Sequence, residues 1–501
     1  MTKIYTTHGI NQTIADFIES QVKSGLVHQT DRIYLANRLA ALLKVDALEN
    51  LSPSDRKNTA LELLDELINY AVSTDQIEDL PSSKDVFSAK LMDLFTPAPS
   101  HVNHQFWKDY NQSPQKATDQ FFGLSRQTNY IKTREIAKNI EYKHETEYGE
   151  LEITINLSKP EKDPKEIARA GKNKPNYPKC MLCMENEGYE GHLSHPGRAN
   201  HRIIRMTVGE EDWGFQYSPY AYYNEHCIFL SHVHREMNVG IQAIRNLTDI
   251  LTVLPHYFVG SNAGLPIVGG SILSHDHYQG GRHTFPLERA EEVFAFELEG
   301  MTDVKAAVIK WPMSVIRLTS NSKDSLIDAA EKVMMVWEGY SDKSVEILSE
   351  TGGVPHNAVT PIARRKGKAF ELDLVLRNNR TSEAYPDGIF HPHPPVQHIK
   401  KENIGLIEVM GLAILPPRLK DELNQVRDYL LGRIEAVDPI HQSWADELKS
   451  EHEITEETVG SIVDKAVGEV FLQVLKDAGV FKTDYNGKEA FKRFITHLKK
   501  V

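Results

Sequence analysis

The stretch His275–Gly281 reads HDHYQGG, within the longer segment GGSILSHDHYQGGRHTF, and sets two histidines two residues apart beside a pair of glycines. In a β-strand, residues two apart point to the same face, so His275 and His277 would share one side of a sheet. Such a pair can bind a metal, provide a nucleophile and its helper, or lie on a surface without function. The rest of the sequence is needed to choose among these.

The composition is that of a globular protein large enough for two or three domains, with 501 residues, 40% hydrophobic and 25% charged. The net charge of −13 disfavours a nucleic acid or an anionic membrane as partner, although a local group of arginines can still bind a phosphate. Met1–Tyr5 lacks the apolar core of a signal peptide, and no apolar run is long enough to span a membrane. Three cysteines are too few for a disulfide framework, and their scarcity suits the reducing cytoplasm. We therefore expect a cytoplasmic protein, and we expect it to be an enzyme.

The pattern of hydrophobic residues divides the chain into four parts. Residues 1–99 are expected to form a helical N-terminal module, because Ser52-Pro53-Ser54-Asp55 offers a helix start and Leu61, Leu64, Ile68 and Ala71 follow at helical spacing. Pro97 and Pro99 mark its end. Residues 100–300 and 301–417 are expected to be two α+β halves, and residues 418–501 a helical C-terminal part.

Two segments of the central body place apolar residues at every second position, with mostly polar residues between them. These are Leu151–Leu157 and Phe370–Leu376, and a period of two predicts a half-buried strand in each. Helical spacing returns from about Arg418, first in Leu419, Leu423, Val426 and Leu430, and again in Ile462, Ala466, Val470 and Val474. The plan is therefore mixed, with strands in the middle and helices at both ends.

Cys180-Met181-Leu182-Cys183 has the spacing at which two thiolates bind one tetrahedral zinc ion. A second Cys-x-x-Cys is absent, so the remaining ligands would have to be histidines, with His232, His234 and His275 as candidates. The alternatives are a chance pair of half-buried cysteines, or a thioredoxin-like redox pair. The redox interpretation is weaker because no βαβ pattern surrounds the motif.

Two further segments suggest a ligand. The first, ENEGYEGHLSHPGRANHRIIRM, supplies Arg198, Arg202 and Arg205, and the planar guanidinium of arginine suits phosphate, although a solvated basic loop is the commoner fate of such residues. The second holds six aromatic residues within eleven positions. We expect most of these to be core residues rather than a stacking platform for a base: Trp213, Phe215, Tyr217, Tyr220, Tyr222 and Tyr223.

The surroundings of His277 favour catalysis over a surface role. A histidine that attacks phosphorus must be neutral, with one ring nitrogen free and the other held by a partner. Glycines such as Gly280 and Gly281 let the backbone approach a phosphate, and an amide such as Gln279 can hydrogen-bond its oxygens.

Taken together, these motifs resemble the galactose-1-phosphate uridylyltransferases of the histidine-triad superfamily. The family pattern is His-Pro-His-x-Gln, and this chain has Asp276 where proline is usual. With CMLCMENEGY, NHR, FQYSPYAYYNEHC and HDHYQGGRHTFP, that departure resembles the second, bacterial class of the family, which also has a long helical N-terminal segment. The resemblance implies two related α+β half-barrel units in the central body.

The resemblance also implies a reaction, the exchange of UMP between UDP-glucose and galactose 1-phosphate in the Leloir pathway of galactose metabolism. His277 would be the nucleophile that forms a uridylyl-histidine, and Gln279 would bind the phosphate oxygens. Residues expected to bind substrate are Arg198, Asn200, Arg202, Asn262, Ser274, Arg282 and Glu408. No organic cofactor is implied, and the family suggests a homodimer.

For metals, the resemblance implies a structural zinc held by Cys180, Cys183, His234 and His275, with His232 as a competitor for the third place. A second metal site of the family uses a glutamate and three histidines, and His356, His391 and His393 resemble those histidines. Their spacing differs from the family pattern, so the sequence does not assign a second metal.

Two other functions remain open at the level of sequence. One is a nucleotide hydrolase or phosphorylase of the same superfamily, which would release free UMP or a phosphorolysis product. The other is a non-catalytic, zinc-stabilised nucleotide-binding protein, in which His277 would only contact the ligand.

Overall fold

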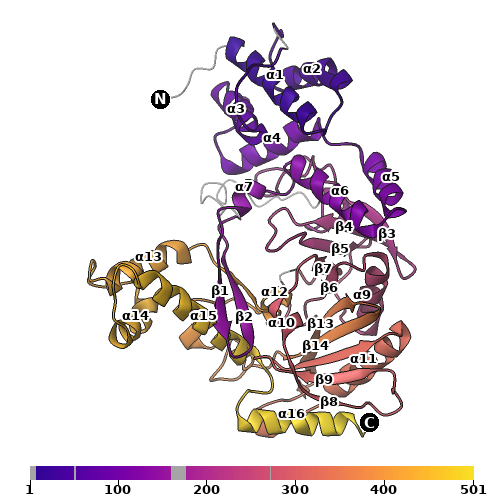
Figure 1. The fold of residues 1–501 in the computed structure, drawn as a ribbon, viewed down its shortest axis with the longest axis vertical. Coiled ribbons are helices and arrows are strands. Elements are labelled where there is room, and N and C mark those ends of the chain that lie inside the picture. Colours follow the sequence, from indigo (N-terminus) through magenta and orange to yellow (C-terminus); the bar gives the residue numbers. More distant parts are fainter. Residues whose placement is uncertain (1–6, 50–51, 159–176, 271, 501) are drawn as a thin grey trace.

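A computed structural model describes residues 7–49, 52–158, 177–270 and 272–500 of the chain, so Met1–Tyr5 lies outside it. Figure 1 shows N-terminal helices at one end of the long axis and the C-terminal helix at the other, with a large sheet between them. Helix and strand both contribute substantially, so the fold is α+β, as the sequence predicted. None of the helices in the described ranges is both long and apolar enough to cross a membrane.

The N-terminal part consists of four helices around their own apolar core, α1 (Thr7–Lys23), α2 (Arg32–Leu42), α3 (Ala60–Ser73) and α4 (Pro81–Asp93). The predicted apolar face of α3 is confirmed, since Leu64, Ile68 and Ala71 are buried. Its predicted start is wrong. Thr59 caps the helix and forms a reciprocal capping box with Glu62, which satisfies two backbone donors at once. Ser54 instead donates to Asp16 of α1.

Three further helices lead from this module to the central body, α5 (Pro99–Tyr110), α6 (Pro114–Gln127) and α7 (Thr133–Ile136). Pro99 lies in the first turn of α5, where a missing N–H costs no helical hydrogen bond. A hairpin follows, β1 (Ile140–Thr146) and β2 (Gly149–Ile155), and β15 (Leu412–Leu415) adds to β2 in parallel. The strand predicted over Leu151–Leu157 is confirmed up to Ile155, where β2 ends.

The central sheet has ten strands in the order β3-β4-β5-β7-β6-β13-β14-β10-β9-β8. Their bounds, in chain order, are β3 (Ile204–Val208), β4 (Glu211–Tyr217), β5 (Cys227–Ser231), β6 (Phe258–Gly260), β7 (His277–Gly281), β8 (Glu292–Phe296), β9 (Lys305–Ile309), β10 (Val315–Ser320), β13 (Asn357–Lys366) and β14 (Ala369–Asn378). A small separate hairpin is formed by β11 (Glu350–Thr351) and β12 (Val354–Pro355).

The ten strands are two copies of one topology. In each copy three antiparallel strands are followed by a helix and two more strands, and the last strand is inserted between the third and the fourth. The helices are α9 (Ile241–Val253) in the first copy and α11 (Lys323–Glu338) in the second. The copies join where β6 pairs antiparallel with β13. The hairpin of β8 and β9 spans the boundary predicted at 300/301, and the four-part division itself stays a prediction.

The two faces of the sheet are covered differently. Helices α9 and α11 pack on one face over a large apolar core, together with residues of α5, α6 and α16 (Tyr485–Leu498). The opposite face forms a second core with the β1-β2-β15 sheet, α10 (Pro286–Arg289), α12 (Leu406–Val409), α13 (Leu419–Leu430), α14 (Pro439–Glu451) and α15 (Val459–Ala478). The predicted apolar face of α13 is confirmed, because all four of its predicted residues are buried.

The strand predicted from Phe370 is confirmed as β14, but its half-burial is wrong. Every residue of β14 after Ala369 is buried, including Asp373 with no exposed surface. Asp373 accepts hydrogen bonds from Arg317 of β10 and Arg364 of β13, at 2.6–2.9 Å. Alternation therefore marks a strand here with one apolar face and one buried ionic face.

Candidate active site and metal centre

His277 is the first residue of β7, in the interior of the sheet between β5 and β6. Its side chain is 7% exposed, and its Nδ1 lies 2.7 Å from the backbone carbonyl of His275. A carbonyl only accepts, so Nδ1 carries the proton and Nε2 has the lone pair. No residue in the described ranges hydrogen-bonds Nε2. Burial lowers the pKa of His277 to about 4, so the imidazole is neutral at ordinary pH and has the form of a nucleophile.

Gln279 points to the same face of β7 as His277, because the two are separated by one residue of the strand. Its Oε1 lies 3.0 Å from Nε2 of His226, which directly precedes β5. Across the sheet, Gln279 pairs with Gly260 of β6. The side chains of Gln279 and His277 therefore share one face of β7.

The two glycines after Gln279 are explained by packing within the protein. A Cβ on Gly280 would approach the carbonyl oxygen of Phe258 to 2.7 Å, and one on Gly281 would approach that of Glu225 to 2.8 Å. Gly281 also has φ +155°, which disfavours other residues. These contacts, rather than close approach of a phosphate, account for both residues.

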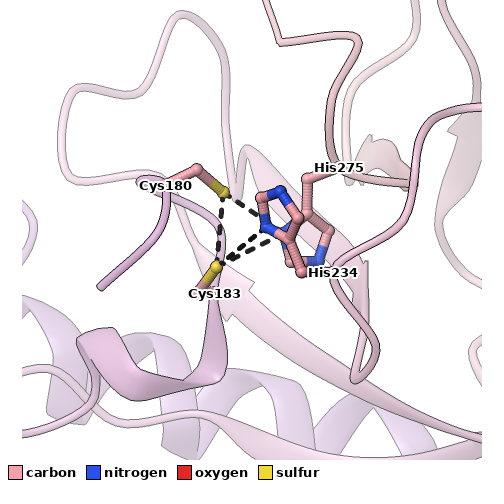
Figure 2. Close-up of side chains that lie close together, drawn as sticks. All are labelled: Cys180, Cys183, His234 and His275. Atoms are coloured by element: carbon pink, nitrogen blue, oxygen red, sulfur yellow. Dashed lines mark hydrogen bonds between the residues drawn. The ribbon is translucent and has the colours of Figure 1, made fainter. Parts of the chain in front are cut away.

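Cys180, Cys183, His234 and His275 converge as the sequence analysis expected (Figure 2). Their ligand atoms all lie within 4.8 Å of one another, and the shorter separations are 3.1 Å from Cys183 Sγ to His234 Nδ1 and 3.2 Å from Cys180 Sγ to His275 Nδ1. The two sulfur atoms are 3.5 Å apart. Ligands of tetrahedral zinc lie roughly 3.3–3.8 Å from one another at ordinary bond lengths, so the group fits such an ion. His232, the competing candidate, is exposed.

A hydrogen bond on the side of the ring away from the sulfurs fixes the orientation of His275. Its Nε2 lies 2.8 Å from the carbonyl oxygen of Ser231, so Nε2 carries the proton and Nδ1 presents a lone pair to the two sulfurs. Asn186 in turn donates to the carbonyls of Cys180 and Cys183, both at 2.8 Å. Burial raises the pKa of Cys183, a cost that a bound cation would reverse by favouring the thiolate. The donor set and its support thus fit a metal.

No other group of three or more metal-binding side chains is present in the described part of the chain. The three histidines considered for a second metal each have a separate partner. His356 contacts Asn379 and Thr351, His391 lies 3.4 Å from Asn403, and His393 lies 2.9 Å from the carbonyl oxygen of Ile389.

Three of the residues expected to bind substrate are engaged elsewhere. Arg202 is buried, and its guanidinium donates to Asp93 and to the carbonyls of Thr96, Pro97, Ala199 and His201. Arg282 pairs with Glu225 and with Asp119 of α6. Asn200 donates to the carbonyl of Thr128. Within the described residues, none of these three side chains forms a hydrogen bond or ion pair with His277.

The other four residues expected to bind substrate lie in three separate places. Arg198 is half-buried and lies 5.5 Å above the ring of Tyr130. Ser274 is exposed, directly before His275. Asn262, two residues beyond Gly260, accepts the N–H of Leu406 at 2.8 Å, which joins it to α12, and Glu408 of the same helix contacts Lys400 at 3.0 Å. Asn262 and Glu408 are therefore close to each other.

Most of the aromatic segment belongs to the core, as expected. Trp213, Phe215, Tyr217 and Tyr223 are buried. Sequence reasoning did not single out His226, because its contact with Gln279 joins residues 53 positions apart and depends on strand pairing.

Comparisons with known proteins show which family the sequence resembles. A family model described as "Galactose-1-phosphate uridyl transferase, N-terminal domain" matches residues 25–236, and its C-terminal counterpart matches residues 251–446. A galactose-1-phosphate uridylyltransferase of Ligilactobacillus salivarius is 54% identical over 485 residues, which cover 96% of this chain and 97% of that protein. One of Streptococcus pneumoniae is also 54% identical, over 97% of this chain and 99% of that protein.

Among solved structures, the yeast Ap4A phosphorylase Apa2 is 13% identical with a TM-score of 0.33, over 61% of this chain and 90% of that one. The two family models and the full-length relatives together identify the protein: the chain belongs to the galactose-1-phosphate uridylyltransferase family.

Proposed function

We propose that this protein exchanges UMP between UDP-glucose and galactose 1-phosphate by a ping-pong mechanism in which His277 is the covalent nucleophile. The observation that carries the proposal is the free Nε2 lone pair of His277, which is fixed by the hydrogen bond of Nδ1 to the carbonyl of His275. Family membership supports the substrates, since the relatives are galactose-1-phosphate uridylyltransferases.

In the first half-reaction, Nε2 of His277 attacks the α-phosphorus of UDP-glucose. An N–P bond forms, and the bond from the α-phosphorus to the bridging oxygen breaks, so that glucose 1-phosphate leaves with the electron pair. The leaving group is a phosphate anion and needs no strong general acid. The positive charge that develops on the ring is shared with the carbonyl of His275 through Nδ1–H.

In the second half-reaction, a phosphate oxygen of galactose 1-phosphate attacks the same phosphorus. The N–P bond breaks, its electron pair returns to Nε2, and UDP-galactose leaves. Gln279 would donate to the phosphate oxygens in both steps, since it lies on the same face of β7 as His277. The candidates for substrate contacts are Arg198, Asn200, Arg202, Asn262, Ser274, Arg282 and Glu408. Three of them, Asn200, Arg202 and Arg282, also have partners within the protein.

The residues Cys180, Cys183, His234 and His275 would hold zinc, because two thiolates and two imidazoles are the donor set that zinc prefers. When bound, the ion would supply a structural cross-link between the Cys-x-x-Cys turn and the start of β7. We further propose that the protein is a homodimer and works in the cytoplasm, to which its few cysteines are suited.

A half-reaction exchange tests the mechanism without galactose 1-phosphate. Labelled glucose 1-phosphate is mixed with unlabelled UDP-glucose and purified protein, and a covalent mechanism moves label into UDP-glucose. A mechanism that needs both substrates bound together gives no exchange. Release of free UMP from UDP-glucose alone would instead indicate a hydrolase.

A further inference from the structure

His226 is a buried histidine next to the proposed active site that the mechanism above does not use. It is 4% exposed and directly precedes β5, the strand that pairs with β7. Its Nε2 lies 3.0 Å from Oε1 of Gln279. In the described part of the chain this is the one hydrogen bond that the side chain of Gln279 makes.

The proton of His226 can be placed from its neighbours. The backbone N–H of Tyr222 points to Nδ1 of His226 at 3.5 Å. A backbone N–H only donates, so Nδ1 holds the lone pair, and in the neutral ring the proton lies on Nε2. His226 Nε2 is therefore a donor toward Gln279.

The ring of His226 is held in this orientation and kept neutral. The rings of Tyr222 and Tyr223 flank it, with centroid distances of 5.5 Å and 4.5 Å and interplanar angles near 30°. Burial lowers the pKa of His226 to about 4, so a second proton on Nδ1 is disfavoured.

The hydrogen bond from His226 to Gln279 is important because the two ends of the Gln279 amide differ, one being a donor and the other an acceptor. A phosphate oxygen only accepts hydrogen bonds, so the NH2 end stabilises it and the carbonyl end repels it. A rotation of 180° about the last side-chain bond exchanges the two ends at little steric cost. Some partner must therefore fix the rotation if the amide is to act as a donor in every turnover.

We propose that His226 is a positioning residue that donates to the carbonyl oxygen of Gln279 and so directs its NH2 group to the transferred phosphate. The inference rests on the proposed function of Gln279. It predicts that the hydrogen bond between His226 and Gln279 stabilises the transition state, in which charge on the phosphate oxygens is redistributed. The same hydrogen bond should contribute little to the binding of UDP-glucose.

The test compares two substitutions of His226, each in the natural background and in combination with Gln279→Ala. His226→Gln keeps an N–H donor near the position of Nε2, and His226→Leu removes it. We measure kcat and KM for uridylyl exchange, with the thermal unfolding midpoint and metal content as controls for folding.

We expect His226→Leu to lower kcat about tenfold with KM within twofold, less than the ~10²-fold expected for loss of a phosphate donor. His226→Gln should keep kcat within about threefold, and His226→Leu should have no further effect on Gln279→Ala. Equal losses for His226→Leu in both backgrounds, or no rescue by glutamine, would overturn the inference while leaving the function of Gln279 intact. Full activity of Gln279→Ala would overturn the role of Gln279 itself, and with it the need for His226.

Discussion

The backbone carbonyl of His275 accepts the Nδ1 proton of His277 at 2.7 Å, while the side chain of His275 presents Nδ1 to the sulfurs of Cys180 and Cys183. One residue thus joins the candidate metal centre to the candidate nucleophile. The His-x-His spacing is explained by this arrangement, because the first histidine orients the second through its main chain. A metal at this centre would stiffen the backbone that fixes the tautomer of His277.

Replacing Cys183 tests the metal centre. We expect Cys183→Ser to lower bound metal, measured by elemental analysis, by more than half, and to lower activity because the backbone at His275 loses its anchor. Cys227→Ala is the matched control, since Cys227 is also buried but lies outside the group. Equal metal content in Cys183→Ser and the natural protein would contradict the assignment.

Removing the amide of Gln279 tests its contact with phosphate. Gln279→Ala should slow exchange on the order of 10²-fold, as for loss of one donor that stabilises a developing charge. The loss should appear in kcat for both half-reactions, because the same phosphate is transferred in each. An effect confined to KM would mean that Gln279 only binds substrate.

The buried ionic face of the second copy is expected to be structural. Burial favours the neutral form of Asp373, but Arg364 and Arg317 more than offset this and hold its pKa below the usual value. Asp373→Asn would leave two buried guanidinium groups with Glu371 as their one remaining buried carboxylate. We expect a loss of about 3 kcal/mol in the free energy of unfolding by urea, the lower end for a broken buried ion pair. Glu292→Gln, in an exposed pair with Lys305 on the same sheet, should cost less than about 1 kcal/mol.

His398 should make the protein sensitive to mild acid. Burial lowers its pKa to about 4 from an ordinary 6.5, with help from His441 and Arg418 nearby, whereas the unfolded chain keeps the ordinary value. The unfolded state therefore binds more protons between pH 6.5 and 4, so stability falls as the pH falls through this window. His398→Leu should reduce this pH-dependent loss by roughly 1–3 kcal/mol in urea titrations, and His452→Leu, at an exposed position, should not. The same slope in all three proteins would contradict the account.

Local pattern was enough to predict part of the fold. The alternation from Leu151 and from Phe370 correctly predicted strands, because side chains two apart share a face whatever the tertiary context. It did not reveal that Asp373 is buried, because that depends on arginines of two other strands. The start of α3 was missed because two capping sequences lie within eight residues, and only Thr59 with Glu62 forms the reciprocal box.

In the candidate site, too, local sequence motifs were predictable and contacts between distant residues were not. The two cysteines and His275 were predicted from spacing and family resemblance, and the structure brings them together with His234 rather than His232. The prediction that Arg202 and Arg282 bind phosphate stays a prediction. The sequence did not reveal that these arginines pair with Asp93 and Asp119, which lie more than 100 residues away in the chain. The sequence shows where an arginine lies but not which distant carboxylate pairs with it in the fold.

The most direct test of the account is to trap the uridylyl group on His277. The protein is mixed with UDP-glucose labelled in the uridine, without acceptor, denatured rapidly at alkaline pH, and mapped by peptide mass spectrometry, with His277→Gly as the control. We expect label on His277, transfer of that label to UDP-galactose when galactose 1-phosphate is added before denaturation, and neither label nor turnover in His277→Gly. Active protein without bound label, or label on another residue, would contradict it.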